Sequence, residues 1–390
     1  MKIIILNHNQ EYFGTYFRCQ MFGQALAETY GHEVIMLCAS GKNFDPIIRK
    51  QKISERFTII TLPRIKYGQY FSGQLLRLII TLFYLLGKRK YDLVYAFTVA
   101  QPQIAIPAVI AKIIRRKRLM IDWDDLWGGG FANLHGGLVA RVLTFFEIKT
   151  LQFADHITYV SQLLGDKLTK LTHIQSSKVP NACNYEQTRS IPKALARQKV
   201  RLPDDLPIVI SVGNTYTESF NNMIKAFASA KTIKPELQLV LIGELNLSKE
   251  QEDLLNEHRS NIIIIGRVPY QEIGTYLSSA DALLLPMDNN PIEEARFPMR
   301  FGDYLCIGRP IISNAVGEVK YYLEKYNCGY VSSPNDFTAM AKHIIAACEN
   351  STYNQEISEQ ARSVASGVLN RNHIVEKLAE IIKNIEFIRT

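Results

Sequence analysis

The sequence contains no uninterrupted run of about 18 apolar residues, so we expect no membrane-spanning helix. Its six cysteines lie far apart and form no C-x-x-C pair, which argues against a zinc site or a disulfide framework and fits a reducing compartment. The amino terminus lacks the basic flank, the long apolar stretch and the small-residue cleavage site of a secretory signal. These absences together predict a cytoplasmic protein.

The commonest catalytic signatures are also missing. There is no G-x-G-x-x-G, which argues against a nicotinamide-dependent enzyme, and neither G-x-S-x-G nor H-E-x-x-H is present. Basic residues are rarely interleaved with aromatic ones and no known nucleic-acid-binding module is recognisable, so we expect no nucleic-acid partner.

The apolar residues that are present suffice for two packed domains, because the chain is 390 residues long and 47% hydrophobic. Its positive charge is concentrated in one half. Residues 1–185 hold 23 basic and 12 acidic residues, a balance of +11, whereas residues 186–390 hold 22 and 25, a balance of −3. This asymmetry predicts either an anionic partner for the first half, such as an anionic membrane surface, or solvated helix ends.

Strand-like and helix-like segments alternate in both halves of the chain. Short apolar runs occupy residues 2–7, 34–38, 91–97, 119–121 and 156–160, and then 207–212, 237–242, 262–265, 282–285, 310–313 and 329–331. Runs of this kind, separated by helices, are typical of parallel sheets that are buried on both faces. Two such series predict two doubly wound α/β domains, in which ligands bind at the carboxyl ends of the strands.

The sequence also suggests where the domains begin and end. Residues 186–206 are polar and basic, contain two prolines and predict a linker. We therefore expect an N-terminal Rossmann-like domain over residues 1–185 and a C-terminal one over residues 207–371. Residues 372–390 carry apolar residues at helical spacing, which predicts a C-terminal helix that could pack back on the first domain.

The stretch 297–311, FPMRFGDYLCIGRPI, carries most of the chemical information. It predicts a helix with Arg300 and Asp303 three positions apart, and therefore on one face, followed by a turn into an apolar strand. A cation at a helix start can hold a diphosphate, and a carboxylate one turn later can accept hydrogen bonds from ribose hydroxyls. The alternative is an ordinary surface ion pair between the two residues.

The sequence resembles the GT-B nucleotide-sugar glycosyltransferases, and within them glycosyltransferase family 4, and the resemblance extends over nearly the whole chain. Residues 297–311 match the family's segment F-P-x-K/R-x-x-E-Y-L-A-x-G-x-P-V. Three other stretches are similar to patterns of the family. Its G-G-x-x-E loop corresponds to residues 315–319, its G-x-V…L…Y…A-D series to residues 266–281, and its V-x-P-N-G strand end to residues 179–182. The order and spacing of the matches make the resemblance specific. It implies the GT-B fold, in which two doubly wound parallel-sheet domains face a central cleft.

The resemblance implies roles for individual residues. Arg300 would act as a catalytic residue that neutralises charge on the donor diphosphate, and Asp303 would bind the ribose hydroxyls. The other implied donor contacts are Arg267 and Val268 beside the base, the amides of Val316 and Gly317 on the phosphates, and Gly14 and Thr15 in a loop near the diphosphate and the acceptor.

Three carboxylates within four residues, Asp122, Asp124 and Asp125, follow an apolar strand. Like charges this close tend to raise the pKa of at least one of them, which is common at functional sites. Asp124 stands where the family often has a histidine, so Asp124 and Asp125 are candidate catalytic residues that would orient the donor sugar or the acceptor. The alternatives are helix capping and a metal site. Asp-x-Asp binds metal in a different glycosyltransferase fold, so we expect no metal requirement.

Two departures from the family pattern bear on catalysis. The family usually has a further glutamate eight residues before the acidic position that Asp303 occupies, and this glutamate falls on Ala295. Its neighbour Glu294 is the candidate catalytic replacement, with Glu293 beside it. The arginine and lysine that usually follow the first strand of the nucleotide domain fall on Asn214 and Ser219.

Without those two cations, diphosphate binding depends on Arg300, with Arg18 as a further candidate. The resemblance implies a hexosyltransferase that retains anomeric configuration and needs no cofactor besides its donor, a UDP or GDP sugar. The alternatives are a nucleotide-sugar epimerase of the same fold and a non-catalytic nucleotide-sugar-binding homologue.

Residues 75–86, LLRLIITLFYLL, are strongly apolar and lie between basic residues, but this run is too short to cross a bilayer. It predicts either a buried core helix or an interfacial one. Family members with lipid-linked acceptors have basic, apolar first domains of this kind. The resemblance therefore implies a carbohydrate or lipid-linked acceptor, a role in bacterial polysaccharide or glycolipid assembly, and docking on the inner membrane face.

Overall fold

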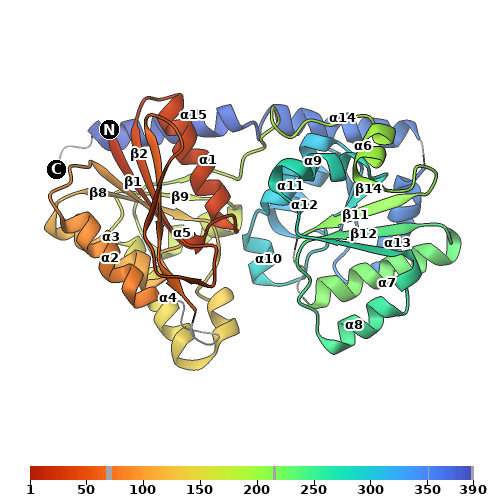
Figure 1. Ribbon diagram of the computed structural model, residues 1–390, viewed down its shortest axis with the longest axis horizontal. Helices are drawn as coiled ribbons and strands as arrows, with labels where there is room; N and C mark the ends of the chain where they lie inside the picture. Colours follow the sequence, from red (N-terminus) through yellow and green to blue (C-terminus); the bar gives the residue numbers. More distant parts are fainter. Residues whose placement is uncertain (67–72, 214–216, 350, 388–390) are drawn as a thin grey trace. The chain divides into compact units, whose positions relative to one another are not determined.

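The computed structural model describes residues 1–66, 73–213, 217–349 and 351–387 (Figure 1). They form two compact units: unit 1 comprises Met1–Pro180 and the C-terminal segment from Ile374, and unit 2 comprises Asn181–His373. Each unit is built around its own, largely parallel sheet. No helix in these residues is both long and apolar enough to cross a membrane.

The boundary between the units differs from the expected one. Residues 186–206 belong to unit 2 and contain a helix, α6 (Lys193–Val200), where we expected a linker. One of its basic residues, Arg197, is buried, and its Nη2 lies 2.8 Å from Asp281 Oδ2. The polar composition therefore reflects a buried ion pair as well as solvent exposure. The division falls between Pro180 and Asn181 instead of after residue 185.

The described part of unit 1 contains an eight-stranded sheet in the order β10-β9-β8-β7-β1-β2-β5-β4. Its strands are β1 (Lys2–Gln10), β2 (Glu33–Ala39), β4 (Arg49–Lys52), β5 (Phe57–Leu62), β7 (Leu93–Phe97), β8 (Arg118–Trp123), β9 (His156–Tyr159) and β10 (Ser176–Lys178). All neighbours pair in parallel except β4 and β5, and a separate antiparallel pair is formed by β3 (Phe44–Asp45) and β6 (Arg64–Ile65). The strand order reverses between β1 and β7, and the carboxyl ends of strands at such a point form a binding position.

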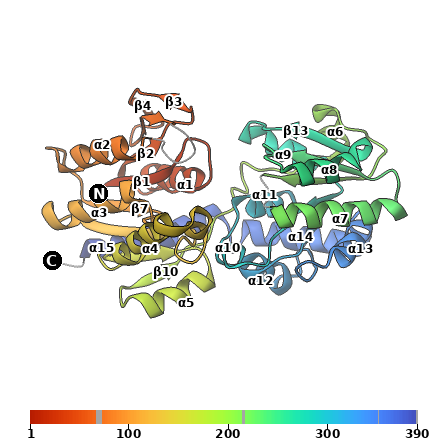
Figure 2. The same cartoon turned by 90° about the horizontal axis from the view of Figure 1, so that it is seen from below.

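Helices cover the faces of this sheet: α1 (Thr15–Glu28), α2 (Gln74–Leu86), α3 (Pro102–Ile114), α4 (Gly137–Leu151), α5 (Gln162–Leu171) and α15 (Arg371–Phe387), with a short 3-10 helix, η1 (Phe131–His135). Both views show α2, α3 and α4 side by side (Figures 1 and 2). β5 was not among the expected strands, although its β-branched sequence FTIITL was an available signal and it pairs with β2 along its whole length.

The described part of unit 2 contains a six-stranded, all-parallel sheet in the order β13-β12-β11-β14-β15-β16. Its strands are β11 (Ile208–Val212), β12 (Gln238–Ile242), β13 (Ile262–Gly266), β14 (Ala282–Leu284), β15 (Ile311–Ser313) and β16 (Tyr330–Val331). They coincide with the apolar runs in the second half of the sequence. Along the chain this is the Rossmann order 3-2-1-4-5-6, which reverses between β11 and β14.

The helices of unit 2 pack on both faces of its sheet, and Figure 1 shows α7 and α8 on one face with α9 and α11 on the other. They are α6, α7 (Thr217–Ile233), α8 (Lys249–Asn256), α9 (Tyr270–Ser278), α10 (Pro291–Ala295), α11 (Met299–Ile307), α12 (Gly317–Lys325), α13 (Phe337–Ala347) and α14 (Thr352–Ser366), with a 3-10 turn, η2 (Arg259–Asn261). The core between α7, α13 and the sheet includes Phe220, Phe227, Leu239 and Ile344, which are all fully buried.

Candidate functional site

Arg300 lies at the point where the strand order of unit 2 reverses. It is the second residue of α11, a helix that begins after Pro298 and ends at Gly308 with a left-handed φ of 66°. Its Nη1 donates a 2.8 Å hydrogen bond to the carbonyl oxygen of Val212, the last residue of β11. The guanidinium therefore stands at the carboxyl end of the central strand, where ligands of this architecture bind.

Gly213 allows the guanidinium to come this close to the strand. Its φ is +94°, in a region that favours glycine, and a Cβ atom at this position would lie 2.8 Å from Arg300 Nη1. A larger residue would therefore displace the cation. Two local features therefore determine where the guanidinium of Arg300 lies: the start of α11 and the glycine that follows β11.

Tyr304, one turn after Arg300, attaches α11 to two strands. Its hydroxyl accepts a 2.9 Å hydrogen bond from the N–H of Val212 in β11 and donates one of 3.2 Å to the carbonyl of Leu284 in β14. Burial raises the pKa of Tyr304 to about 12, so the phenol stays protonated at neutral pH. These two bonds bridge the switch point and hold α11 in place there.

Asp303 was expected to share a face of α11 with Arg300, but the two side chains contact different elements. Asp303 Oδ1 accepts a 2.8 Å hydrogen bond from the hydroxyl of Tyr270, the first residue of α9. Desolvation raises the pKa of Asp303 to about 7, although the Tyr270 hydrogen bond opposes the rise. Sequence reasoning did not identify Tyr270 as a partner, because the two residues are 33 positions apart.

Of the two adjacent glutamates in α10, Glu293 is buried and Glu294 is exposed. Glu293 Oε2 lies 2.8 Å from Arg296 Nη2, and its Oε1 is buried without a hydrogen-bond partner among the described residues. Burial raises the pKa of Glu293, and the positive charges of Arg296 and Arg300 oppose the rise. Glu294, the expected catalytic residue, is thus exposed, whereas its neighbour Glu293 is buried and feels the charges of Arg296 and Arg300.

Val316 and Gly317 lie at the start of α12, Val316 at the N-cap and Gly317 as the first helical residue. The N–H groups of a helix start have no intrahelical partner and attract anions. Gly317 has a φ of +53°, and a Cβ atom on it would lie 2.2 Å from the carbonyl oxygen of Glu294. Glycine therefore lets the start of α12 contact α10, which brings these amides close to the glutamate pair.

Arg267 and Val268 directly follow β13, and Arg267 lines a hollow of about 510 Å³. The residues that line it include Gly243, Glu244, Gly266 and Arg267. Arg267 Nη1 lies 3.8 Å from Glu244 Oε2, and both side chains are largely exposed. The hollow has the volume of a small-molecule site.

Neighbouring strand ends of unit 2 are tied together. The N–H of Gly213 donates to the carbonyl of Ile242 at 2.7 Å, and the N–H of Gly243 donates to the carbonyl of Gly266 at 2.9 Å. The ends of β11, β12 and β13 therefore form one continuous edge, which runs from Arg300 to the hollow.

In unit 1, Thr15 and Asp124 meet at the carboxyl edge of the sheet. Thr15 Oγ1 donates to Asp124 Oδ2 at 2.6 Å, and Thr98 Oγ1 donates to Asp124 Oδ1 at 2.8 Å. These residues follow β1, β8 and β7 respectively, and Gly14 is the N-cap of the helix that Thr15 begins. The structure thus brings Gly14, Thr15 and Asp124 together at the switch point of this sheet.

Helix capping does not explain the carboxylates after β8. The next two helices, η1 and α4, have Gly130 and Gly136 at their N-caps, so neither Asp124 nor Asp125 is a cap residue. Asp125 is half-buried, whereas Asp124 is buried. The contacts of Asp124 with two threonine hydroxyls fix its orientation more firmly than a solvent-exposed position would.

Arg18 is not available to a diphosphate. Its side chain is 1% exposed and pairs with Asp122, which is fully buried. The same guanidinium donates hydrogen bonds of 2.6 and 3.1 Å to the carbonyls of Val179 and Pro180, the last residues of unit 1 before the boundary. The expectation that Arg18 assists Arg300 is therefore wrong, because its donors are already engaged inside unit 1.

Glu147 in α4 is a buried residue that the sequence analysis missed. It accepts hydrogen bonds from the indole N–H of Trp123 at 2.7 Å and from the backbone N–H groups of Trp127 at 3.1 Å and Gly128 at 2.5 Å. It therefore pins the loop that contains Asp124. The available signal was a single acidic residue within an apolar helix. Such a residue is expected to have hydrogen-bond partners, because a buried charge without partners is costly.

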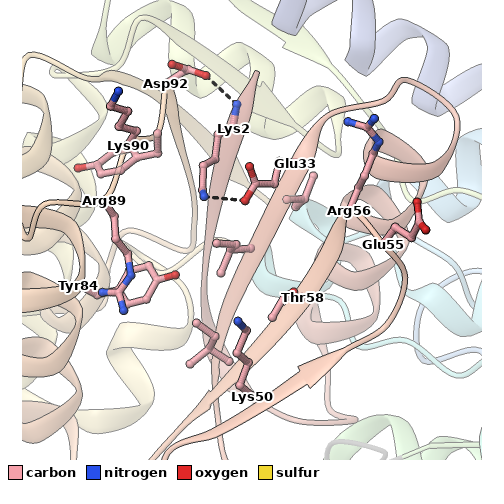
Figure 3. A pocket seen from close by; sticks show the side chains of 14 residues that line it. Lys2, Glu33, Lys50, Glu55, Arg56, Thr58, Tyr84, Arg89, Lys90 and Asp92 are labelled. Atoms are coloured by element: carbon pink, nitrogen blue, oxygen red, sulfur yellow. Dashed lines mark hydrogen bonds and ion pairs between the residues drawn. The ribbon is translucent and has the colours of Figure 1, made fainter.

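Unit 1 also contains a hollow, of about 570 Å³, which lies at the amino-terminal ends of its strands (Figure 3). Figure 3 shows Lys2 between Glu33 and Asp92: its Nζ lies 2.6 Å from Glu33 Oε1, and its backbone N–H donates to Asp92 Oδ2 at 2.7 Å. We do not assign this hollow to the site, because ligands of parallel sheets bind at the opposite edge.

Of the two positions at which the family has an arginine and a lysine, Asn214 lies outside the described residues. Ser219 is buried in α7, and its hydrogen bonds to Asp288 oppose the rise that burial causes in the pKa of that carboxyl. Within the described ranges, no group of three or more His, Cys, Asp or Glu side chains is arranged to hold a metal ion.

Comparison with solved structures identifies the fold. Sucrose-phosphate synthase from Thermosynechococcus elongatus aligns over 98% of both chains with 18% identity and a TM-score of 0.76. WaaG, a glycosyltransferase involved in lipopolysaccharide biosynthesis, aligns over 98% of this chain and 99% of its own, with 16% identity and a TM-score of 0.72. Anabaena HepE in complex with UDP and glucose aligns over 98% and 99%, with 15% identity and a TM-score of 0.71. The chain has the GT-B fold.

The second unit resembles a known family. Residues 192–364 match the family described as Glycosyl transferases group 1. TuaH of Bacillus subtilis strain 168, named as a glycosyltransferase of teichuronic acid biosynthesis, is 24% identical over 258 residues. This alignment covers 64% of the chain and 62% of TuaH, so the chain spans less than two thirds of that relative.

Proposed function

We propose that the protein transfers a hexose from a nucleoside diphosphate donor to an acceptor hydroxyl, with retention of anomeric configuration. The observation that carries the proposal is Arg300, whose guanidinium is held on the Val212 carbonyl at the switch point of the unit 2 sheet. A fixed, partly desolvated cation at this position suits a diphosphate leaving group. The match of residues 192–364 to the family of group 1 glycosyl transferases supports the same activity.

The proposed donor is a UDP or GDP sugar that lies along the edge formed by the ends of β11, β12 and β13. Its diphosphate would contact Arg300 and the amides at the start of α12, and its ribose would contact Asp303. Its base would occupy the hollow beside Arg267 and Val268. HepE, which was solved with UDP-glucose, and an E. coli neighbour bound with UDP-2-fluoro glucose support a donor of this class.

In the proposed reaction, the bond between the anomeric carbon and the diphosphate oxygen breaks while the acceptor oxygen bonds to that carbon on the same face. The acceptor proton passes to an oxygen of the leaving diphosphate, so neither a covalent enzyme intermediate nor a metal ion is required. Arg300 would stabilise the charge that develops on the diphosphate. Asp124, oriented by Thr15 and Thr98, would position the acceptor hydroxyl or the donor sugar.

We also propose that the acceptor is lipid-linked and that the enzyme works on the inner membrane face in polysaccharide or glycolipid assembly. Helix α2 supports this because it buries polar side chains and exposes apolar ones, the reverse of an ordinary surface helix. The side chains of Arg77 and Thr81 are buried, whereas Leu75 is 71% exposed and Phe83 is 76% exposed. Of the two sequence interpretations, core helix or interfacial helix, this pattern favours the interfacial one.

The helices next to α2 also carry exposed apolar side chains. Exposed large apolar side chains are Leu75, Leu76, Ile79, Phe83 and Leu86 in α2, Ile113 and Ile114 in α3, and Leu138, Val139, Val142 and Phe145 in α4. Their spacing along α2 and α4 is that of one helix face. Single exposed apolar residues are normal, but a set shared by three adjacent helices marks an interaction surface. We call this set the three-helix face.

The charge around the three-helix face fits an anionic bilayer. Helices α2, α3 and α4 contain one acidic residue, Glu147, and it is buried. Exposed cations lie in or after these helices, at residues 88–90, 116, 141 and 149. Each cation near an anionic membrane contributes about 1 kcal/mol of attraction, and burial of apolar side chains adds to it.

Vesicle binding tests the membrane part of the proposal. The protein should co-sediment with vesicles containing phosphatidylglycerol, less with pure phosphatidylcholine, and less at high salt. A Phe83→Asp/Phe145→Asp variant should bind at least about tenfold more weakly, because two apolar contacts are lost. Ile233→Asp, at a 67% exposed position in unit 2, is the matched control and should bind normally. Wild-type protein that stays in the supernatant with both lipids would exclude this part alone.

The activity is tested by incubating the protein with UDP and GDP sugars, with and without a polyprenyl-diphosphate-linked sugar, and following donor and product by NMR. Transfer that depends on the acceptor and keeps the anomeric configuration supports the proposal. Donor converted to an epimer without acceptor indicates an epimerase, and nucleotide binding without turnover indicates a non-catalytic homologue. The nucleoside diphosphate that raises the melting temperature most identifies the base.

A further inference from the structure

We infer that Tyr270 is a positioning residue for the donor: its hydroxyl holds the Asp303 carboxylate in the orientation in which it accepts the ribose hydroxyls. This inference rests on the proposed function, since it takes the donor ribose as the ligand of Asp303. It adds a residue that lies outside the donor segment of the sequence.

The geometry supports a dedicated contact. The Tyr270 hydroxyl donates to Asp303 Oδ1 at 2.8 Å, from the first turn of α9 to the middle of α11. A side-chain hydrogen bond with Thr188, which is 7% exposed, also orients the phenol. The Tyr270 side chain itself is 40% exposed, so the contact is not a by-product of core packing. A carboxylate accepts several hydrogen bonds, so Asp303 keeps acceptor capacity for the ribose.

The sequence of this chain makes such a support useful. Asp303 stands where the family segment has a glutamate, and its side chain is one methylene shorter. A shorter carboxylate reaches less far and has fewer orientations from which to meet two hydroxyls. Fixing one oxygen with Tyr270 selects among those orientations before the nucleotide arrives, which reduces the entropy cost of binding.

No charged group faces Asp303 in the contacts that the structure describes. The titratable groups that interact with it are the phenols of Tyr270 and Tyr304 and the thiol of Cys183. Burial raises the pKa of Tyr304 to about 12, and a hydrogen bond with Cys306 together with burial raises the pKa of Cys183 well above its ordinary value, so neither group carries a charge at pH 7. The ionisation of Asp303 therefore depends on desolvation, which raises its pKa to about 7, and on the Tyr270 hydrogen bond, which lowers it.

The direction of the pH effect follows from these two causes. Ribose hydroxyls donate to the ionised carboxylate, so nucleotide affinity is full above pH 7 and falls as Asp303 protonates below it. Without the Tyr270 hydroxyl the pKa of Asp303 rises, so the same loss of affinity begins at a higher pH.

Tyr270→Phe tests the inference because it removes only the hydroxyl. UDP and GDP affinities are measured by calorimetry from pH 6 to 9, with donor KM and kcat at pH 8. We expect the affinity for the better nucleotide to fall by about five- to tenfold, the net value of one ordinary hydrogen bond. The midpoint of the pH dependence should rise, and the donor KM should rise while kcat changes by less than about twofold.

Two further variants separate the possible causes. Tyr353→Phe, at an exposed tyrosine of α14 whose hydroxyl contacts Asn327, is the matched control and should leave affinity and midpoint unchanged. Asp303→Asn should weaken nucleotide binding and remove the part of the pH dependence that Asp303 contributes, leaving only the titration of the terminal phosphate of the nucleotide.

The outcomes distinguish this inference from the function on which it rests. If Tyr270→Phe matches the wild type in affinity and midpoint while Asp303→Asn binds weakly, the role of Tyr270 is refuted and the donor site stands. Tighter binding by Tyr270→Phe would show that the phenol competes with the ribose, which also overturns the inference. If Asp303→Asn binds nucleotide normally, or the wild type binds none, the proposed donor site itself fails.

Discussion

The guanidinium of Arg18 and the carboxylate of Asp122 form a two-point ion pair inside unit 1, with Nε–Oδ1 and Nη2–Oδ2 distances of 3.0 and 2.9 Å. Asp122 also accepts hydrogen bonds from the hydroxyls of Tyr95, at 2.8 Å, and Thr158, at 2.6 Å. The pair thus belongs to a buried network in which each charge has several partners. Burial still raises the pKa of Asp122, which shows how much desolvation the network must offset.

Replacing Arg18 by methionine should lower the free energy of unfolding of unit 1 by about 3–5 kcal/mol, because the carboxylate of Asp122 would remain buried without its counter-ion. Tryptophan fluorescence during urea denaturation measures this well. The chain has two tryptophans, Trp123 and Trp127, and both lie in unit 1, so the signal does not mix the unfolding of the two units.

Arg49→Met provides the control for this measurement. Arg49 pairs with Asp45 and with Glu11 in the same unit, but its side chain is 40% exposed. Exposed ion pairs contribute about 0–1 kcal/mol, so this variant should lose correspondingly little stability. Equal and small losses in both variants would show that the Arg18–Asp122 pair does not hold unit 1 together.

Arg300→Ala should reduce turnover by about 100-fold or more, because the charge developing on the diphosphate would lose its fixed cation. Arg300→Lys keeps the charge but loses the planar donor that reaches the Val212 carbonyl, so its rate should lie between those of wild type and alanine. Steady-state kinetics with saturating acceptor gives both numbers. A near-normal rate for the alanine variant would remove Arg300 from the mechanism.

Gly213→Ala should weaken donor binding although position 213 offers no side chain to a ligand. The added Cβ would lie 2.8 Å from Arg300 Nη1, and its φ of +94° is strained for alanine. Gly31→Ala separates these two effects, since Gly31 has a φ of +70° but a Cβ atom added there would meet no other atom within 4 Å. We expect both variants to lose stability and only Gly213→Ala to lose nucleotide affinity. Equal affinities in calorimetry would mean that Arg300 does not depend on Gly213.

The fold was predictable because its strands are buried on both faces. Such strands are nearly continuous apolar runs, and the six runs in the second half of the sequence became β11 to β16. The boundary was not predictable from composition. A composition count treats charged residues as surface residues. The buried ion pair between Arg197 and Asp281 breaks this assumption, so the polar stretch that contains Arg197 was taken for a linker.

The site was predictable to the level of strand ends. Arg300, Thr15 and Asp124 stand where the alternation of strands and helices placed them. The choice between Glu293 and Glu294 was not predictable, because successive helical residues point about 100° apart and the phase of α10 decides which one is buried. The Tyr270–Asp303 contact joins two helices, and such a contact depends on packing that local sequence does not encode.

Asp124→Asn should lower kcat by about 100-fold while leaving nucleotide affinity unchanged, if this carboxylate positions the acceptor or the donor sugar as proposed. The amide keeps the size of the side chain, but it removes the charge and offers only one oxygen to the hydroxyls of Thr15 and Thr98, which now contact one carboxylate oxygen each. Asp125→Asn, at the half-buried neighbouring position, controls for a general loss of negative charge after β8 and should have the smaller effect. Calorimetry with the nucleotide and single-turnover transfer measure the two quantities separately. A larger loss in Asp125→Asn than in Asp124→Asn would transfer the proposed role to the second carboxylate, and weaker nucleotide binding in Asp124→Asn would contradict a role confined to the transfer step.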